Sequence, residues 1–225
     1  MALFDGLFRP SAVLAVCLLG CTTAGAAEIR VDPSRAGATG AVLEGRIVAG
    51  DFDKFKSFIG NDGNVTELYL ASPGGDLAEA MKIGLLVRNL KLSTVVPSKT
   101  LTNQQRDLTT ARHNLKDAKA DYLCASACFF IFVAGIHRGS DDQGPPILGI
   151  HKPSLAENNL SRWNLDQTTA ADTRVETAVE GYLKLMDVPS KYAEIMYSVP
   201  KRRIRWIRDD EFQADFSGVI SERGH

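Results

Sequence analysis

The chain has 225 residues, of which 44% are hydrophobic and 24% are charged, as is typical of a soluble globular protein with one sizeable core. Its 26 basic and 27 acidic residues leave a formal net charge of −1. This balance argues against a nucleic-acid-binding surface, because such surfaces carry an excess of Lys and Arg.

Residues 1–27 have the pattern of a secretory signal peptide. Arg9 precedes an apolar run over residues 12–20, and small residues that suit cleavage follow as far as Ala27. The apolar run is too short for a stable membrane span. We therefore expect a protein that is periplasmic or secreted, with cleavage near Ala26 or Ala27.

The leader also offers a second route of processing. Residues 18–21, Leu-Leu-Gly-Cys, resemble a bacterial lipobox, in which cleavage before Cys21 is followed by attachment of a lipid. Only that route would anchor the chain to a membrane.

The remaining chain is interpreted as a lead-in over residues 28–40, with a strand expected at 29–31, and a single domain over residues 41–225. Strands are expected at 42–47, 65–70, 92–96, 147–150, 204–207 and 218–220, and helices at 51–59, 77–90, 127–134, 170–186, 189–197 and 209–216. This alternation predicts an α/β fold with largely parallel strand pairing.

The domain is interrupted at about residues 97–121 by a polar insertion that is rich in helix formers. Leu101, Leu108 and Leu115 recur every seven residues, so a helix here would present one narrow apolar stripe. The stripe could pack over a groove as a lid or contact another subunit. A solvated surface hairpin is an equal alternative.

A glycine-rich turn follows the strand expected at 65–70. Residues 72–76 read Ser-Pro-Gly-Gly-Asp and lead into the next helix. Two glycines at a strand-to-helix turn allow a backbone amide to approach a ligand closely. The turn is therefore a candidate binding element.

Ser126 lies among small residues between two apolar runs, where a backbone can turn tightly and leave a hydroxyl uncovered. A helix is expected from Ala127 to Ala134, ended by Gly135. Its first amides, Ala127 N–H among them, would point toward a negative charge beside the serine. Ser126 is thus a candidate nucleophile, with a buried cap of a core helix as the alternative.

His151 follows the apolar run 147–150 and is fixed by Lys152 and Pro153, so its ring is expected to project from the edge of a buried sheet. That position suits a general base. A core histidine with satisfied hydrogen bonds is the alternative.

Together, these motifs resemble the proteolytic subunit of Clp proteases and its relatives in the crotonase superfamily. The resemblance rests on Ser-Pro-Gly-Gly at residues 72–75, on Ser126 with an Ala-Gly pair ending nine residues beyond it, and on Ile-His-Lys-Pro at residues 150–153. It covers most of the chain from about Val42 to Ile220 and looks nearest to an uncharacterised periplasmic branch.

The resemblance implies a crotonase-like (Clp-protease-like) superhelix of ββα units. It implies Ser126 as the nucleophile, His151 as the general base, and the backbone amides of Gly75 and Ala127 as the oxyanion hole. It also implies a homo-oligomer that acts on peptides or unfolded proteins and needs no cofactor.

Two positions depart from the family pattern. Pro200 lies where the catalytic aspartate would fall, with no acid beside it, and Tyr122 replaces a glycine four residues before the serine. We therefore expect Ser126 and His151 to act as a dyad, or with a backbone carbonyl orienting the imidazole, and turnover to be slow. The candidates for a displaced acid are Asp166, Asp172 and Asp187.

Cys124 and Cys128 are the cysteines that would remain after removal of residues 1–27, and they flank Ser126. Because an exported compartment is oxidising, a disulfide between them is one expectation, and two small buried thiols are the other. One cysteine pair without a nearby histidine does not make a metal site, so we expect no metal.

Three functions are consistent with these observations. The first is an exported, ATP-independent serine hydrolase, specifically a peptidase that acts on extended or unfolded substrates. The second is a catalytically degenerate member of the same fold that binds peptides or proteins, which the missing acid favours. The third is a crotonase-like acyl-CoA enzyme, against which the pairing of Ser126 with His151 and the exported location both count.

Overall fold

The computed structural model describes residues 26–31, 40–61, 63–98, 123–140, 146–153, 165–207 and 219, with the backbone alone at 165–169. Several sequence predictions lie outside the described residues. These are residues 1–25 of the expected signal peptide, residues 99–121 of the insertion, the helix at 209–216, and residues 218 and 220 of the last strand.

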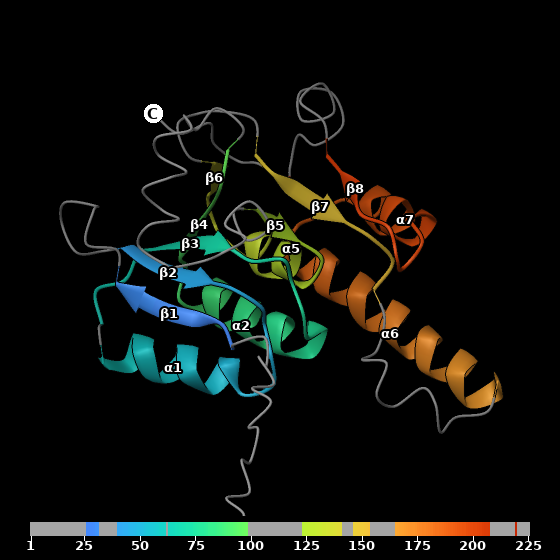
Figure 1. Cartoon of the computed structure of the whole chain (residues 1–225), viewed down its shortest axis with the longest axis horizontal. Helices are drawn as coiled ribbons and strands as arrows, with labels where there is room; N and C mark the ends of the chain where they lie inside the picture. The colour runs from blue at the N-terminus through green and yellow to red at the C-terminus, as the bar shows by residue number, and fades with distance from the viewer. Residues whose placement is uncertain are drawn as a thin grey trace, which may run out of the picture.

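Two β-sheets organise the described part of the chain (Figure 1). The larger has five strands in the order β1-β2-β3-β4-β6, and the smaller has three in the order β5-β7-β8. The strands are β1 Glu28–Val31, β2 Gly40–Glu44, β3 Glu67–Ala71, β4 Ser93–Val96, β5 Cys124–Ala125, β6 Arg138–Ser140, β7 Leu148–Ile150 and β8 Arg205–Trp206. Neighbouring strands pair in parallel except β1 with β2 and β7 with β8.

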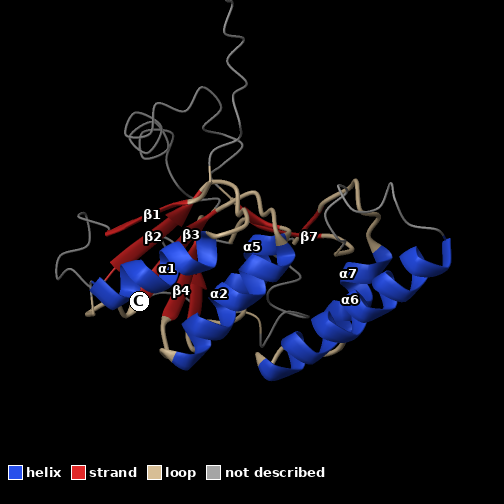
Figure 2. Ribbon diagram, turned by 90° about the horizontal axis from the view of Figure 1, so that it is seen from below, coloured by secondary structure: helices blue, strands red, loops and turns tan. Residues whose placement is uncertain are grey.

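The helices lie on one side of the strands, as Figure 2 shows. They are α1 Asp51–Asn61, α2 Leu77–Asn89, α5 Ala127–Phe132, α6 Leu165–Leu185 and α7 Lys191–Ser198. Helix α1 connects the parallel strands β2 and β3, and α2 connects β3 and β4, because parallel neighbours need a crossover. The α/β architecture predicted from the alternation of elements is confirmed.

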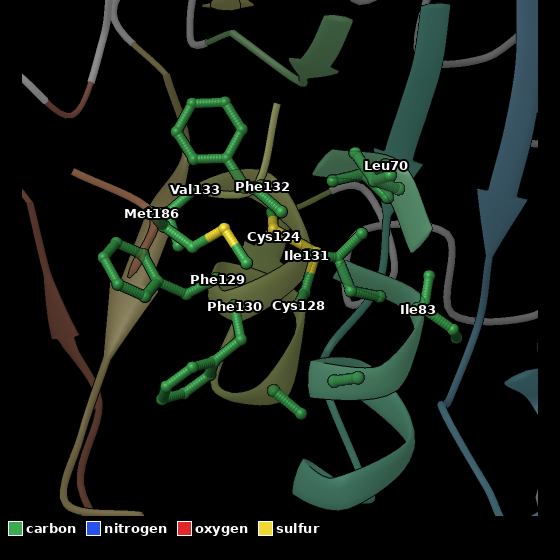
Figure 3. Close-up of a cluster of buried hydrophobic side chains, with 14 of the residues drawn as sticks. Leu70, Ile83, Cys124, Cys128, Phe129, Phe130, Ile131, Phe132, Val133 and Met186 are labelled. Atoms are coloured by element: carbon green, nitrogen blue, oxygen red, sulfur yellow. A yellow bond between two sulfur atoms is a disulfide. The ribbon is translucent and has the colours of Figure 1, made fainter. Parts of the chain in front are cut away.

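Helix α5 lies in the hydrophobic core, and all of its residues are buried. Its sequence, Ala-Cys-Phe-Phe-Ile-Phe, is apolar on every side, as expected for a helix surrounded by protein. Figure 3 shows its side chains gathered with Leu70 of β3, Ile83 of α2 and Met186. Ser126 directly precedes this helix, so its position is fixed by the core.

The two sheets meet at Ser72, directly after β3. Its N–H donates to Leu123 O at 2.7 Å, and its carbonyl accepts from Ala125 N–H at 3.0 Å. Its buried Oγ accepts from Gly74 N–H at 3.0 Å. The end of β3, the glycine turn and β5 therefore form one hydrogen-bonded seam.

Some boundaries differ from those expected. Strand β2 ends at Glu44 rather than at residue 47, because Gly45 turns with a φ of 90° and donates its N–H to Ala71 O at 2.9 Å. Helix α5 ends at Phe132 rather than at Ala134. Helix α6 begins at Leu165, before the expected residue 170. Its first turns contain Asp and Thr, which are weak helix formers, so the sequence did not indicate this start.

Two arginines hold the C-terminal end of α6. Arg88 of α2 and Arg138 of β6 both donate to the carbonyl of Met186, where a cation is favourable. Burial and the charge of Arg88 lower the pKa of Arg138 to about 10, so this group stays cationic at neutral pH. The hydroxyl of Tyr182 donates to Phe130 O at 2.7 Å. Helix α6 is thus attached to α2, β6 and α5.

Candidate active site

Ser126 occupies a strained turn between β5 and α5. Its φ of 56° and ψ of −121° lie outside the regions that residues with a side chain normally adopt, at a cost of about 1–3 kcal/mol. The turn is held because Ser126 N–H donates to Gly149 O at 2.9 Å and Ser126 O accepts from Phe129 N–H at 3.1 Å. Strain that the surroundings enforce in this way is often found at functional sites.

The Ser126 hydroxyl contacts the His151 imidazole, with 2.6 Å between Oγ and Nε2. The contact follows from the parallel pairing of β5 with β7, in which Ala125 is in register with Gly149. His151 Nδ1 lies 3.0 Å from Lys152 O, and since a carbonyl can only accept, Nδ1 carries the proton. Nε2 is then the acceptor of the serine proton, as a general base requires.

The loop that carries His151 is tied to the end of α7. Lys152 N–H donates to Val199 O at 3.0 Å, and Lys152 Nζ lies 5.7 Å from the centroid of the Tyr197 ring, a cation–π distance. Val199 directly precedes Pro200, where the family pattern would place an aspartate. Here that segment supports the histidine loop through its backbone.

Tyr197 is a neutral phenol near the histidine loop. Burial, together with the negative charges of Glu176, Glu180 and Asp172, raises its pKa to about 12. Its hydroxyl has no hydrogen-bond partner among the described residues. At neutral pH it is therefore a protonated donor that is not used within the described structure.

The candidates for a displaced acid are engaged elsewhere or not described. Asp172 Oδ1 lies 3.4 Å from Lys201 Nζ, and the exposed Asp187 lies 3.6 Å from Arg88 Nη2. The side chain of Asp166 lies outside the described residues. Among the described side chains, no carboxylate bonds to His151, so the geometry favours a backbone carbonyl as the orienting group.

We expect Asp172→Asn and Asp187→Asn each to change the rate of any Ser126-dependent reaction by less than about threefold. Neither carboxylate contacts the imidazole, and exposed ion pairs contribute little to stability. The measurement is the labelling rate with a serine-reactive probe, alongside thermal unfolding. A hundredfold loss in either folded variant would point to a displaced triad.

Gly74 lies directly against the turn that carries Ser126. Its φ is 94°, and a Cβ placed on it would lie 2.6 Å from Ala125 O, 2.7 Å from Ser126 Cβ and 2.8 Å from Ala127 N. Only glycine allows the two backbone segments to come this close. The close approach at Gly74 is therefore made to the protein's own turn that carries Ser126.

Two backbone amides at this junction are available for an oxyanion. Within the described residues, neither Gly75 N–H nor Ala127 N–H donates a hydrogen bond. Gly74 O accepts from Ile47 N–H at 2.9 Å. Gly74 O and Gly75 N–H belong to the same trans peptide, in which C=O and N–H point in opposite directions, so Gly75 N–H faces away from Ile47. Ala127 N–H is the first amide of α5 and lies at the positive end of its dipole.

A disulfide joins Cys124 and Cys128 across the serine, with the Cα atoms 5.3 Å apart (Figure 3). Both side chains are fully buried. The bridge links β5 to the first turn of α5 and so restricts the turn that carries Ser126. Of the two alternatives that the sequence left open, the structure contains the disulfide.

We expect the double variant Cys124→Ala, Cys128→Ala to lose about 2 kcal/mol of unfolding free energy, the entropic value for so short a loop. Labelling of Ser126 should slow as well, because the turn loses one of its constraints. Urea unfolding measures the first effect and a labelling time course the second. A reductant should change the wild type but not the variant, and equal effects on both would contradict the role of the bridge.

The groups that sequence reasoning missed are backbone groups. Ile47 holds the glycine turn, Gly149 O holds the Ser126 amide, and Val199 O holds the histidine loop. Only Gly149 carried a signal, because glycine within a strand often marks a close approach. A Cβ on it would lie 2.6 Å from Ile204 Cγ2.

Comparison with known proteins adds no family to this description, since the sequence matches no protein-family model and none of the curated proteins. Within the described ranges, no group of three His, Cys, Asp or Glu residues is placed to hold a metal ion. The helices in those ranges also include none that is long and apolar enough to cross a membrane.

Proposed function

We propose that this protein is an exported serine hydrolase that cleaves peptide bonds without ATP, with Ser126 as the nucleophile and His151 as the general base. The observation that carries the proposal is the 2.6 Å contact between Oγ and Nε2 at a strained, firmly held turn. An activated serine consists of such a nucleophile, a base in contact with it, and a group that orients the base. Lys152 O is the orienting group.

The proposed reaction begins when His151 Nε2 takes the proton of Ser126 as Oγ attacks the substrate carbonyl. The negative charge on the carbonyl oxygen is bound by the N–H groups of Gly75 and Ala127. The imidazolium then protonates the leaving amine, and water, activated by the same imidazole, hydrolyses the acyl-enzyme. Because a neutral carbonyl stabilises an imidazolium less than a carboxylate does, turnover should be slow.

We extend the proposal to the fold and assembly that the resemblance implies. The glycine turn after β3 and the serine turn after β5 lie against each other, which supports a crotonase-like arrangement of ββα units. A homo-oligomer is the assembly that the resemblance implies, and extended or unfolded polypeptides are the proposed substrates.

A catalytically degenerate peptide-binding protein is the second candidate. One observation favours it, namely that no described carboxylate bonds to His151. The unused N–H groups of Gly75 and Ala127 would then bind a peptide carbonyl without a reaction following. An acyl-CoA enzyme would also use paired amides, but it has no need of the contact between Ser126 and His151.

Labelling of the purified protein with a fluorophosphonate probe tests the choice. The probe reacts with serines that a base has activated, so we expect one label per chain, mapped to Ser126 by peptide mass spectrometry. Ser126→Ala should abolish labelling. Ser198→Ala, which removes an exposed hydroxyl bonded to the backbone carbonyl of Ile195, should leave labelling unchanged.

The outcomes separate the two candidates. Labelling that Ser126→Ala abolishes, followed by release of product from an unfolded protein substrate, supports the hydrolase. A folded wild type that does not label supports the binding protein. Labelling that persists in Ser126→Ala would assign the reactivity to another residue and overturn the proposal.

A further inference from the structure

A buried carboxylate lies at the start of α1, outside the candidate active site. The Asp51 side chain is fully buried, and its Oδ1 lies 2.8 Å from Lys54 Nζ. Its Oδ2 accepts the N–H of Val48 at 2.7 Å and the N–H of Ala27 at 3.3 Å. Ala27 is itself only 4% exposed, so the second of these contacts is inside the protein.

The charge of Asp51 is only partly balanced by its neighbours. Lys54 is half-exposed, and a cation that water reaches compensates a buried carboxylate weakly. Glu79 of α2 accepts the N–H groups of Gly50 and Phe52 and is paired with Lys82, so that pair adds no cation to Asp51.

Two further charged residues lie on or beside the chain around Ala27. Glu28 follows it, and the exposed Arg46 forms a backbone bridge with Ala26. Among the described residues, Oδ2 of Asp51 therefore bonds only to backbone amides, and one of them belongs to Ala27.

The sequence before this contact suits peptide-bond cleavage on either side of Ala27. Residues 24–27 read Ala-Gly-Ala-Ala, so cleavage between Ala26 and Ala27 places alanine at both positions where a signal peptidase requires small side chains. Cleavage after Ala27 would remove the group that contacts Asp51. Cleavage before Cys21 would leave that group a neutral amide.

We propose that the leader is removed between Ala26 and Ala27, and that the new α-ammonium group of Ala27 forms a buried ion pair with the carboxylate of Asp51. In this hydrolysis a water oxygen bonds to the Ala26 carbonyl carbon, the C–N bond breaks, and the Ala27 nitrogen gains the protons. The leader departs with a carboxylate. The site is independent of the hydrolase activity proposed above.

The ion pair gives stability a defined pH dependence. An α-ammonium has a pKa of about 7.7–8.0 in an unfolded chain, and a buried carboxylate partner raises this value in the folded chain. Its stabilisation is then fully present below the unfolded pKa and is lost as the pH rises through the raised pKa. Every chain compared below contains the same set of the charged residues named above, which are Lys54, Glu79, Lys82, Glu28 and Arg46.

The cleavage site is tested on the full chain, expressed with its leader in a bacterial host and recovered from the exported fraction. Intact mass and N-terminal sequencing should show a mature protein that begins at Ala27. A chain that begins at Glu28 or at a lipid-modified Cys21 would overturn the proposal. These readouts do not depend on enzymatic activity.

The ion pair is tested with chains that begin at Ala27 or at Ala26, each with Asp51 or with Asp51→Asn. At pH 6.5 we expect the unfolding constant of the chain that begins at Ala27 to be about tenfold smaller than that of the chain that begins at Ala26. Tenfold is the factor that corresponds to a rise of one unit in the pKa of the α-ammonium group. This stability difference between the two chains should vanish in Asp51→Asn. It should persist in the matched control Asp53→Asn, because Asp53 is an exposed acid on the same helical turn. An advantage that survives Asp51→Asn would overturn the pair.

A second measurement covers the case in which Asp51→Asn does not fold. The difference between the Ala27 and Ala26 chains is then followed in the wild-type background from pH 6.5 to pH 10.5. Loss of the Ala27 advantage with rising pH supports the ion pair. A difference that does not change with pH, or the absence of any difference, contradicts it.

Discussion

Replacing His151 by glutamine should lower the rate at which a fluorophosphonate labels Ser126 by at least about a thousandfold. Glutamine is similar in size, but it has no basic nitrogen at the 2.6 Å position that Nε2 occupies against Oγ. In a well-studied serine protease, loss of the histidine costs about a millionfold in kcat. We expect a smaller loss here because the imidazole already lacks a described carboxylate partner.

The measurement is a labelling time course at one pH, with thermal unfolding to show that the variant is folded. His137→Gln is the matched control, since His137 is exposed and lies outside the candidate site. It should label at the wild-type rate. A His151→Gln variant that is folded and labels within tenfold of the wild type would mean that the imidazole does not activate the serine.

Replacing Gly75 by alanine should have the second large effect, and it should act on stability as well as reactivity. A Cβ at this position would lie 2.0 Å from Ile47 O and 2.9 Å from Ile47 C, which are backbone atoms that no change of rotamer can move. The φ of 142° adds strain for any residue with a side chain. We expect a loss of about 3 kcal/mol or more in unfolding free energy.

Reactivity should fall as well, since Gly75 N–H would move with its peptide and one of the two proposed oxyanion donors would be displaced. Loss of one such donor costs about a hundredfold to a thousandfold in kcat. Urea unfolding and labelling of the remaining folded protein measure the two effects. Gly181→Ala is the matched control, because a Cβ there meets nothing within 4 Å and alanine favours a helix. Equal stabilities for the two variants would contradict the packing around Gly75.

The contact between Ser126 and His151 was predictable because its signals are local. Small residues around Ser126 allowed a tight turn, and the apolar run before His151 marked a buried strand. Parallel pairing of the two strands then brings the side chains together. The strained φ of Ser126 is the structural counterpart of the tight turn that the small residues suggested.

The group that orients the imidazole could not be identified from the sequence. It is the carbonyl of Lys152, and every residue carries a carbonyl, so no residue type distinguishes the one that is used. The same holds for Ile47, which contacts the glycine turn through its backbone after a long separation in sequence. The glycines indicated that some backbone would come close, but not which one.

The division into two sheets was also outside the reach of sequence patterns. Strand β5 has two residues and β8 has two, too short for a periodicity to appear. The position of β5 depends on Ser72, whose backbone joins the end of β3 to Leu123 and Ala125, and β8 is placed through its pairing with β7. Pairings of this kind are set by tertiary packing, which local propensity does not encode.

The seam at Ser72 also determines when during folding the site can exist. The contact between Ser126 and His151 spans 25 residues, and the seam joins segments that lie farther apart along the chain, so both must wait for slow, non-local closure. A chain whose individual strands and helices have formed but whose seam is open does not yet hold the glycine turn against the turn that carries Ser126. Under the function proposed above, a nascent polypeptide of this protein would therefore not meet a complete site until its two sheets have joined.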